Sequence, residues 1–387
     1  MKRLAIITTH PIQYNDPWFK LLAVGKKVLP KVFYTWEQTK SGEKHDVGFG
    51  KVISWDIPML EGYEYTFVKN KAKDPGTHHF QGVVNPTLIK EVEEWGAQAI
   101  LVIGWSFHSH LACLRYFHKK VPVLFRGDST LLNERPGIKQ WLRRISLKWV
   151  YKHVDYALYV GANNKAYYLK HGLKEDQLVL APHAIDNNRF AQPDDAYRAE
   201  AKAWRGKLEI TEDNLVLLFA GKLEPNKDPF FITALAKEIP DQRLRIVLVG
   251  NGVLEHELKQ AAALDSRIRF IDFQNQRAMP VMYRIGDVFI LSSQSETWGL
   301  GANEAMASGC AIIMSDKCGG AVDLIKEGVN GMIIRQRDTK DCVRFINDLL
   351  GSRELLKGMQ SASRRLIDNF SFDGIVRATE QICTDNI

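Results

Sequence analysis

Short runs of apolar and β-branched residues alternate with longer segments of helical periodicity along the whole chain. This alternation is typical of parallel sheets whose strands are connected by crossover helices. Strands are expected in the first half at 4–9, 31–36, 99–105, 121–126, 156–160 and 178–181, and in the second half at 215–220, 244–249, 268–273, 288–292, 311–315 and 331–334. Each set can fill one sheet. The sequence therefore predicts an α/β protein with two doubly wound, Rossmann-like parallel-sheet domains.

The length of 387 residues suits two domains of ordinary size. Residues 186–214 are polar and lack a strand pattern, so the boundary is placed within them. We expect an N-terminal domain at 1–195 and a C-terminal domain at 196–369. Residues 370–387 have the pattern of a closing amphipathic helix, which we expect to pack back toward the N-terminal domain.

The composition is that of an ordinary globular protein, with 45% apolar and 25% charged residues, which disfavours disordered and fibrous classes. No apolar run is long enough for a membrane span, and the N-terminus leads directly into a strand pattern, so a cytoplasmic protein is expected. The five cysteines are odd in number and lack Cys-x-x-Cys spacing. They predict neither a disulfide framework nor a zinc site, but small buried apolar residues.

The net charge of +7 is concentrated in the N-terminal half. Residues 1–200 hold 28 Lys and Arg against 20 Asp and Glu, whereas residues 201–387 hold 24 against 25. Within the basic half, a helix over 139–153 would carry both apolar and basic side chains: Trp141, Ile145, Leu147, Trp149, Arg143, Arg144, Lys148 and Lys152. This helix either faces an anionic membrane surface or packs on the core with a solvated basic side. Nucleic-acid binding is disfavoured because no recognised binding motif is present.

Ligands of open α/β sheets bind beyond the carboxyl ends of the strands. After the strand at 215–220 come Gly221, Lys222 and Lys227. The glycine allows the chain to turn, and the two ammonium groups at the start of the next helix suit a diphosphate. The alternative is a pair of solvated loop lysines.

A stronger motif follows the strand at 288–292. Glu296 lies in the loop, and Glu304 lies about one turn into a helix that Gly299 and Gly301 introduce. Carboxylates can accept paired hydrogen bonds from the vicinal hydroxyls of a sugar or a ribose, and the glycines leave backbone amides open to a phosphate. The alternative is that Glu304 caps its own helix and Glu296 is an exposed loop residue.

The run from Ser295 to Gly309 resembles the Glu-x7-Glu motif of family 4 retaining glycosyltransferases of GT-B fold, and Gly221-Lys222 with Lys227 resembles their diphosphate motif. The Gly-Asn-Gly turn at 250–252 and the stretch 182–186 also resemble family landmarks. The resemblance covers nearly the whole C-terminal half and implies two facing domains with a cleft between them.

Carried over to this sequence, the resemblance implies that Lys222 and Lys227 bind the diphosphate and act in catalysis, that Glu296 contacts the donor sugar, and that Glu304 holds the ribose. Transfer would proceed with retention of configuration, by positioning and charge stabilisation. The implied donor site also contains Gly221, Asn251, Gly252, Phe273, Gly299, Leu300 and Gly301. Because no Asp-x-Asp motif is present, neither a metal nor another cofactor is expected.

The N-terminal half departs from the family pattern. The first strand is followed by His10 and Gln13 rather than by a glycine-rich loop, and the usual histidine after 121–125 is replaced, so that its role passes to Arg126 or Asp128 or is lost. His108 is a candidate catalytic and acceptor residue, and Asn163 a candidate residue of the cleft. Each histidine is otherwise a packed, capping or solvated side chain.

The sequence thus predicts a metal-independent retaining transferase that moves a sugar from a nucleotide-sugar donor to a glycan or lipid-linked acceptor, in cell-surface polysaccharide or glycolipid synthesis. Peripheral contact with an anionic membrane is an associated expectation. The alternatives are a catalytically silent nucleotide-sugar-binding subunit and a GT-B-fold nucleotide-sugar epimerase. A Rossmann dehydrogenase is disfavoured because no Gly-x-Gly-x-x-Gly follows the first strand.

Overall fold

The computed structural model describes residues 1–36, 43–46, 51–54, 56–192, 195–335 and 338–385, and it divides the chain into two compact units. The first contains 1–44, 57–183 and 371–387, and the second contains 45–56 and 184–370. The chain thus enters the second unit at Ala184, before the expected boundary at 195/196, because helix α6 (Asn187–Ala191) packs against α11 (Leu300–Ser308).

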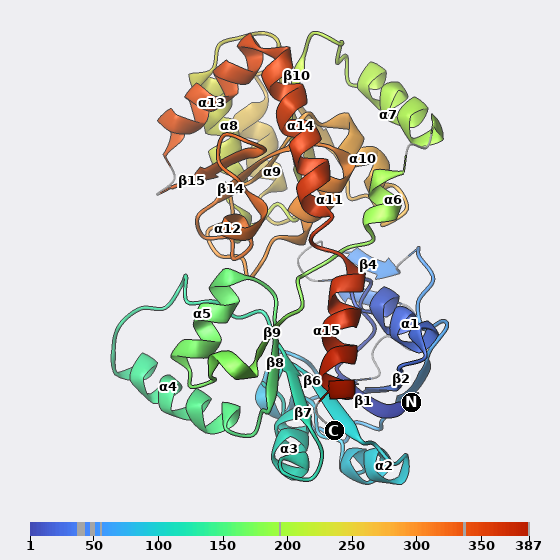
Figure 1. The fold of residues 1–387 in the computed structure, drawn as a ribbon. Coiled ribbons are helices and arrows are strands. Elements are labelled where there is room, and N and C mark those ends of the chain that lie inside the picture. Colours follow the sequence, from blue (N-terminus) through green and yellow to red (C-terminus); the bar gives the residue numbers. More distant parts are fainter. Residues whose placement is uncertain (37–42, 47–50, 55, 193–194, 336–337, 386–387) are drawn as a thin grey trace. The chain divides into compact units, whose positions relative to one another are not determined.

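The first unit is built on a seven-stranded sheet in the order β5-β2-β1-β6-β7-β8-β9, with every neighbouring pair parallel (Figure 1). Its strands are β1 (Lys2–Thr8), β2 (Val28–Tyr34), β5 (Glu64–Phe67), β6 (Ala99–Ile103), β7 (Val123–Arg126), β8 (Tyr156–Tyr159) and β9 (Leu178–Leu180). All expected strands are present. The sequence analysis missed the edge strand β5, which is short and partly exposed and so lacks an apolar run. It also missed the two-stranded sheet of β3 (Glu43–Asp46) and β4 (Lys51–Ser54).

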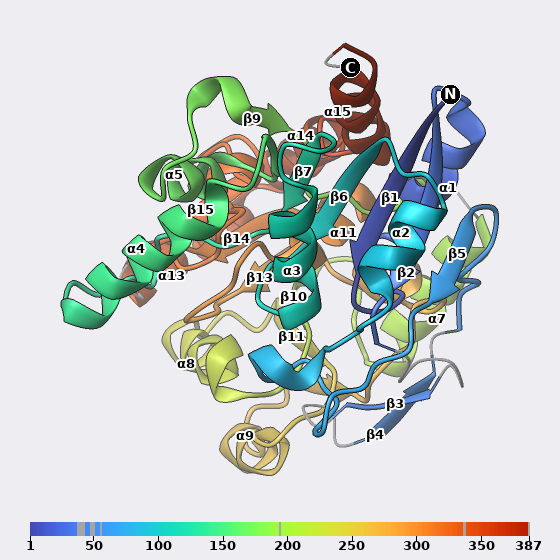
Figure 2. The ribbon, with the colours of Figure 1, turned by 90° about the horizontal axis from the view of Figure 1, so that it is seen from below.

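Helices pack on the strands of this sheet, and Figure 2 shows the whole chain, including these helices, from below. They are α1 (Asp16–Gly25), α2 (Leu88–Glu94), α3 (His108–Phe117), α4 (Ile138–Tyr151), α5 (Ala162–Lys170) and α15 (Phe372–Asp385), with short 3-10 turns η1 (Phe80–Gly82) and η2 (Glu175–Gln177). The C-terminal helix α15 packs against α1 and against β9.

The second unit has a six-stranded parallel sheet in the order β12-β11-β10-β13-β14-β15. Its strands are β10 (Leu215–Ala220), β11 (Leu244–Val249), β12 (Ile268–Ile271), β13 (Val288–Leu291), β14 (Ala311–Ser315) and β15 (Gly331–Ile334). Besides α6 and α11, its helices are α7 (Asp195–Lys207), α8 (Pro229–Glu238), α9 (Glu255–Ala262), α10 (Met279–Ile285), α12 (Ala321–Leu324), α13 (Thr339–Gly351) and α14 (Arg353–Ile367), with the 3-10 turn η3 (Pro225–Lys227). The four inner strands are almost fully buried, as their continuous apolar runs predict, whereas the edge strands β12 and β15 are partly buried.

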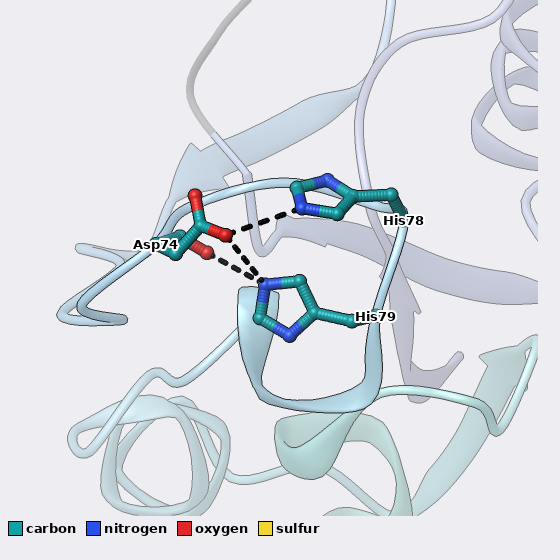
Figure 3. Close-up of side chains that lie close together, drawn as sticks. All are labelled: Asp74, His78 and His79. Atoms are coloured by element: carbon teal, nitrogen blue, oxygen red, sulfur yellow. Dashed lines mark hydrogen bonds and ion pairs between the residues drawn. The ribbon is translucent and has the colours of Figure 1, made fainter.

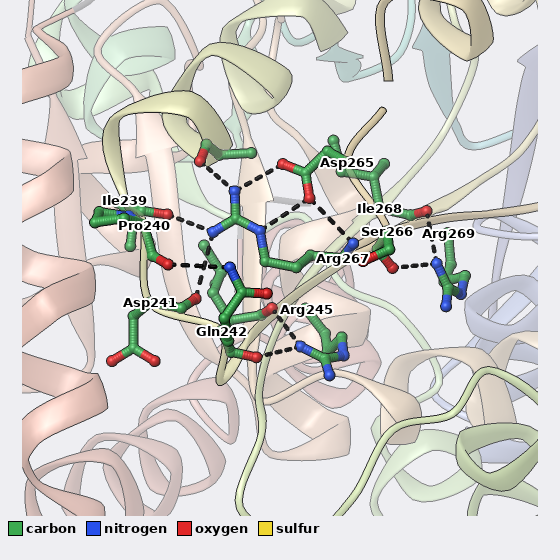
Figure 4. Close-up of polar contacts among 12 residues, drawn as sticks. Ile239, Pro240, Asp241, Gln242, Arg245, Asp265, Ser266, Arg267, Ile268 and Arg269 are labelled. Carbon is green, nitrogen blue, oxygen red and sulfur yellow. Dashed lines mark hydrogen bonds and ion pairs between the residues drawn. The ribbon is translucent and has the colours of Figure 1, made fainter. Parts of the chain in front are cut away.

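Arg267 joins the end of α8 to the start of β12 (Figure 4). It is 7% exposed, and its guanidinium donates to the carbonyls of Ala236 and Ile239 and to both carboxylate oxygens of Asp265. The hydrogen bond from Arg267 holds the pKa of Asp265 below its ordinary value. A buried charge is tolerable here because it is both paired and hydrogen-bonded.

All five cysteines are free and buried, as expected. Burial raises the pKa of Cys113 to about 12, so this thiol is protonated and behaves as an apolar side chain at neutral pH. Within the described part of the chain, no helix is long and apolar enough to span a bilayer.

Candidate active site

Two residues that the sequence analysis assigned to the donor meet beyond the carboxyl ends of β10 and β13. Lys227 ends η3, and Glu296 lies in the loop that follows β13. The Lys227 ammonium donates a hydrogen bond to the Glu296 carboxylate and forms an ion pair with it. Both side chains keep about a fifth of their surface exposed (20% and 21%), so a ligand can reach either group.

Hydrogen bonds to backbone carbonyl groups hold these two loops together. The Asn226 side-chain amide donates to the Ser295 carbonyl (2.8 Å), and the Gln294 amide donates to the Asn226 carbonyl (2.8 Å). The Ser292 hydroxyl donates to the Lys227 carbonyl (3.0 Å). The sequence analysis did not identify Asn226 or Ser292, because their contacts join segments that are remote in the chain. The ion pair is therefore held in place by its surroundings and does not rest on two flexible side chains alone.

Glu304 is 3% exposed in α11, and its carboxylate accepts a hydrogen bond from the Tyr283 hydroxyl of α10 (2.8 Å). An ionised carboxylate can accept about four hydrogen bonds, so this contact leaves capacity for ligand hydroxyls. Tyr283 is a site residue that the sequence analysis missed. A Cβ on Gly301 would lie 3.2 Å from the Tyr283 hydroxyl, so the glycine keeps the space around this hydrogen bond open.

Gly299 begins α11 with a φ of 105°, a conformation that favours glycine. A Cβ here would also lie 2.8 Å from the Leu291 side chain. The first backbone amides of α11, at Leu300 and Gly301, have no partner within the helix in a regular α-helical pattern, which makes them suited to an anion. This arrangement is consistent with a phosphate beside Glu296, as the motif predicts.

The glycine-rich turn after β11 packs directly on the Lys222 loop. A Cβ on Gly250 would lie 2.1 Å from the Gly221 carbonyl oxygen, and a Cβ on Gly252 would lie 2.3 Å from the Leu223 carbonyl oxygen. Both glycines therefore allow a close approach of two backbones. Lys222 lies in this packed loop and is partly buried.

Asn251 braces this corner of the site. Its side-chain amide donates to Glu255 (2.9 Å) and Asp272 (3.0 Å), and its carbonyl oxygen accepts from the Phe273 backbone amide (2.9 Å). Asn251 is only 6% exposed, and its side chain is hydrogen-bonded to these protein groups. The geometry thus gives Asn251 a positioning role for the Phe273 segment; its expected direct contact with the donor remains a prediction.

In the first unit, Arg126 is a buried structural residue. It is 4% exposed at the end of β7, and its guanidinium donates to the carbonyls of Ala181 (2.6 Å) and Pro182 (3.3 Å). Burial lowers its pKa to about 10, which leaves it charged at neutral pH. These hydrogen bonds connect β7 to the segment after β9, and the expected role of Arg126 at the acceptor or cleft remains a prediction.

Asp128 lies close to His183, with 3.8 Å between a carboxylate oxygen and the imidazole Nε2. Burial lowers the pKa of His183. Asp128 also lines a cavity of about 220 Å³, together with Gly104, Trp105, Ser106, Phe125, Gly127, Ser129, Arg143, Tyr151, Tyr167 and Tyr168. This cavity, lined by aromatic rings with one acidic and one basic side chain, is a candidate acceptor pocket in the first unit.

The remaining candidates also lie in the first unit but do not line this cavity. His10 packs edge-on against Trp36, with ring centroids 5.4 Å apart, and Gln13 lies partly buried in the turn before α1. His108 is exposed at the start of α3, 6.0 Å from the Phe80 ring. Asn163 is partly buried in the first turn of α5. Nothing in their contacts distinguishes a catalytic role for His108.

A possible metal-binding cluster that the sequence analysis did not identify lies on the loop after β5 (Figure 3). The Nε2 atoms of His78 and His79 each lie 3.3 Å from a carboxylate oxygen of Asp74. The three donor atoms lie within 4.8 Å of one another, so they could share one divalent cation. His78 and Asp74 are exposed, and His79 is partly buried.

The sequence of the second unit is similar to known glycosyltransferases. Residues 200–366 match the family model described as glycosyl transferases group 1. The chain is 30% identical over 220 residues to a D-inositol 3-phosphate glycosyltransferase of Geodermatophilus obscurus, which is 53% of this chain and 47% of that protein. It is 28% identical over 201 residues to the protein of the same name from Nocardia farcinica. This match covers 49% of this chain and 43% of that protein. The matches thus span about half the length of these relatives.

Solved structures match over the whole chain. The Anabaena protein HepE in complex with UDP gives a TM-score of 0.73 at 15% identity, with both chains fully covered. Sucrose-phosphate synthase from Thermosynechococcus elongatus gives a TM-score of 0.74 at 16% identity, and the match covers 100% of this chain and 99% of that one. At such identities the likeness establishes the fold. The chain has the GT-B fold, with two parallel-sheet α/β domains.

Proposed function

We propose that this protein is a glycosyltransferase that takes a sugar from a nucleotide-diphosphate donor held by the second unit and transfers it with retention of configuration. The observation that carries the proposal is the pairing of Lys227 with Glu296 on the sheet edge where Glu304 and the start of α11 also lie. Cations for a diphosphate, a carboxylate for a sugar and a carboxylate for a ribose are the groups that such a donor requires.

The ion pair suggests how the site accepts its donor. In the free protein Lys227 neutralises Glu296. A diphosphate would attract the Lys227 ammonium, and the Glu296 carboxylate would then be released to accept hydrogen bonds from sugar hydroxyls. As the donor bond breaks, negative charge grows on the leaving phosphate, and Lys222 and Lys227 would stabilise it. These lysines and the amides of α11 supply the charge stabilisation, so we propose that the reaction needs no metal.

HepE structures solved with UDP and with UDP-glucose support a donor of this chemical class. A further structural neighbour is WaaG, a glycosyltransferase involved in lipopolysaccharide biosynthesis, with a TM-score of 0.66 at 13% identity. We propose a glycan or lipid-linked acceptor for this chain, in cell-surface polysaccharide or glycolipid synthesis. The cavity that contains Asp128 and Arg143 is the proposed place of its reacting end.

Helix α4 supports contact with an anionic membrane. Its exposed apolar side chains are Ile138 (79% exposed), Trp141 (60%), Leu142 (55%), Ile145 (48%) and Trp149 (40%). Leu147, which the sequence analysis placed on this face, is instead fully buried and anchors the helix to the core. Lys139, Arg143, Arg144 and Lys148 lie on the same helix. Aromatic and aliphatic side chains flanked by cations suit the headgroup region of anionic lipids.

Product analysis tests the proposed activity. The protein is incubated with a nucleotide sugar, with and without lipid-linked acceptor, and the products are identified by mass spectrometry and by the anomeric proton couplings in NMR spectra. A glycosylated acceptor with the donor's anomeric configuration is expected. Conversion of the donor to an epimer without acceptor would support the epimerase, and donor binding without any turnover would support a silent subunit.

A further inference from the structure

A second cavity lies in the second unit, at the amino ends of the strands. Lys227 and Glu296 lie beyond the opposite, carboxyl ends. The cavity has a volume of about 480 Å³ and lies between α7, α10, α14 and the turn after α11. Gly286 and Asp287, which line it, directly precede β13, whereas Glu296 follows that strand. The cavity is therefore separate from the donor site, and its volume is in the range of small-molecule sites.

The lining of this cavity is strongly basic. Its cationic residues are Arg198, Lys202, Arg205, Arg284 and Arg364. Of the lining residues in the described chain, Asp287 alone is acidic. Its carboxylate accepts a hydrogen bond from the Val216 amide (2.9 Å) and lies 3.6 Å from Arg205, while burial raises its pKa. One carboxylate cannot neutralise five cations, so the cavity carries an excess of positive charge.

Two of the guanidinium groups are held in fixed orientations. Arg205 donates to the Ile285 carbonyl (3.0 Å), and Arg284 donates to the carbonyls of Phe190 and Gln192 (2.7 Å each). Carbonyl oxygens orient a guanidinium but bring no formal negative charge. The walls are thus preorganised, and the single carboxylate of Asp287, which lies near Arg205, is the one acidic group among the described residues that line the cavity.

Arg364 and Ser308 point to where the ligand would bind. The Arg364 guanidinium donates to the Ser308 carbonyl (3.4 Å) and lies over Gly309, where a Cβ would come within 2.1 Å of one of its nitrogens. The Ser308 hydroxyl is buried and has no hydrogen-bond partner among the described residues. A buried hydroxyl without a partner is costly, and an anionic oxygen in the cavity supplies that partner once the enclosed hydroxyl turns toward it.

We propose that this cavity binds a phosphate-bearing small molecule, with the phosphate held by the arginines and by the Ser308 hydroxyl. Guanidinium groups bind phosphate oxygens in a bidentate manner, and a cluster of them suits two or more negative charges. The site borders on the donor machinery, because Arg284 follows Tyr283 in α10 and Ser308 ends the helix that contains Glu304. The cavity thus lies against the two helices that carry the Tyr283–Glu304 hydrogen bond.

Calorimetric titration with inorganic phosphate, inorganic pyrophosphate and glucose 6-phosphate tests the proposal directly, because it needs neither a sugar donor nor turnover. The cavity variant is Lys202→Gln with Arg364→Gln, both exposed side chains. The matched control is Lys222→Gln with Lys227→Gln at the donor site. A third variant, Ser308→Ala, removes only the hydroxyl. Thermal unfolding without ligand verifies that each variant is folded.

The cavity variant is expected to weaken binding of the best probe by about tenfold or more, and Ser308→Ala by about tenfold, as for lost charge-assisted hydrogen bonds. The donor-site control should retain that binding. Preference for glucose 6-phosphate would indicate a sugar phosphate as ligand, and equal binding of phosphate would indicate the free anion. The proposal is overturned if no probe binds at millimolar concentration, or if binding survives the cavity substitutions and is lost only in the donor-site control.

Discussion

Lys227 and Glu296, which are 69 residues apart in the sequence, form an ion pair that links the loops after β10 and β13. Each residue belongs to a different segment of the expected donor site, one to the diphosphate lysines and the other to the Glu-x7-Glu pattern. Their contact brings the two segments together. In the proposed site, the free protein thus holds the sugar-binding carboxylate against the cation that a diphosphate would bind.

The two halves of this pair are expected to respond differently to substitution. In Glu296→Gln, Lys227 loses its internal counter-ion, so UDP or another cognate nucleoside diphosphate should bind as tightly as in the wild type or more tightly, while transfer is lost. In Lys227→Gln, nucleoside diphosphate binding should weaken about tenfold, because a charge-assisted contact is removed. Calorimetry and turnover rates measure both effects. Equal weakening of nucleotide binding by both substitutions would argue against the exchange of partners.

Tyr283→Phe tests whether the hydrogen bond to Glu304 positions that carboxylate. The substitution keeps the ring and removes the donor to a carboxylate that is 3% exposed. We expect the free energy of unfolding to fall by about 1–3 kcal/mol, as for a buried hydrogen bond to a charged group. Nucleoside binding should weaken, whereas inorganic pyrophosphate binding to the lysines should not. Tyr156→Phe at the partly buried start of β8 is a control in the other unit.

The pairing of Arg267 with Asp265 predicts how the stability of the folded protein changes at acid pH. The pKa of Asp265 is lowered in the folded protein by the Arg267 hydrogen bond, so this pair stabilises the fold above the unfolded-state pKa of about 3.9. That stability is lost as the pH falls through the lower, folded-state pKa. Urea unfolding should therefore show that Arg267→Gln is destabilised most near neutral pH and that its difference from the wild type shrinks toward pH 3.

Arg243→Gln is the matched control for this experiment. Arg243 also pairs with an aspartate two residues away, Asp241, but its side chain is 53% exposed and the pair is open to solvent. Exposed pairs contribute little, so the control should differ from the wild type by less than about 1 kcal/mol at every pH. A loss of stability in Arg267→Gln no larger than that of the control would contradict the structural role of the buried guanidinium.

Helix α4 predicts binding to anionic vesicles. Co-sedimentation with vesicles of phosphatidylcholine and phosphatidylglycerol should be lost in Trp141→Ser with Ile145→Ser, and weakened by salt in the wild type. Leu264→Ser, at a residue of the second unit that is fully exposed (102%), is the control for loss of an exposed apolar side chain. Binding that both variants reduce equally would indicate non-specific adsorption instead of contact through α4.

The sequence predicted the two sheets well, because buried strands leave local signals, and the glycines of the expected donor site lie where the backbone requires them. Buried parallel strands read as continuous apolar runs, and Gly299 and Gly301 mark a turn that only small residues allow. The edge strand β5 has no such run. Contacts between remote segments, such as Tyr283 with Glu304, have no local signature either.

The first unit was less predictable for a physical reason. Arg126 follows a strand and carries a charge, which made it a candidate for ligand contact, yet carbonyl groups after β9 already engage its guanidinium. Leu147 of α4 is buried, whereas Trp141, Ile145 and Trp149, which the sequence analysis grouped with it, are exposed. Both outcomes depend on how the helices and strands pack, and packing is not encoded in a short segment.

The central claim is that the second unit binds a nucleotide-diphosphate sugar through Lys227, Glu296 and Glu304. Calorimetric titration with UDP, GDP, ADP and dTDP, on the wild type and on Glu304→Gln, tests it most directly, with Glu257→Gln on the exposed face of α9 as the control. We predict that one nucleotide binds, about tenfold more weakly to Glu304→Gln and unchanged to Glu257→Gln. Failure of all four to bind the folded wild type at millimolar concentration, or equal affinity for all three proteins, would contradict the donor site.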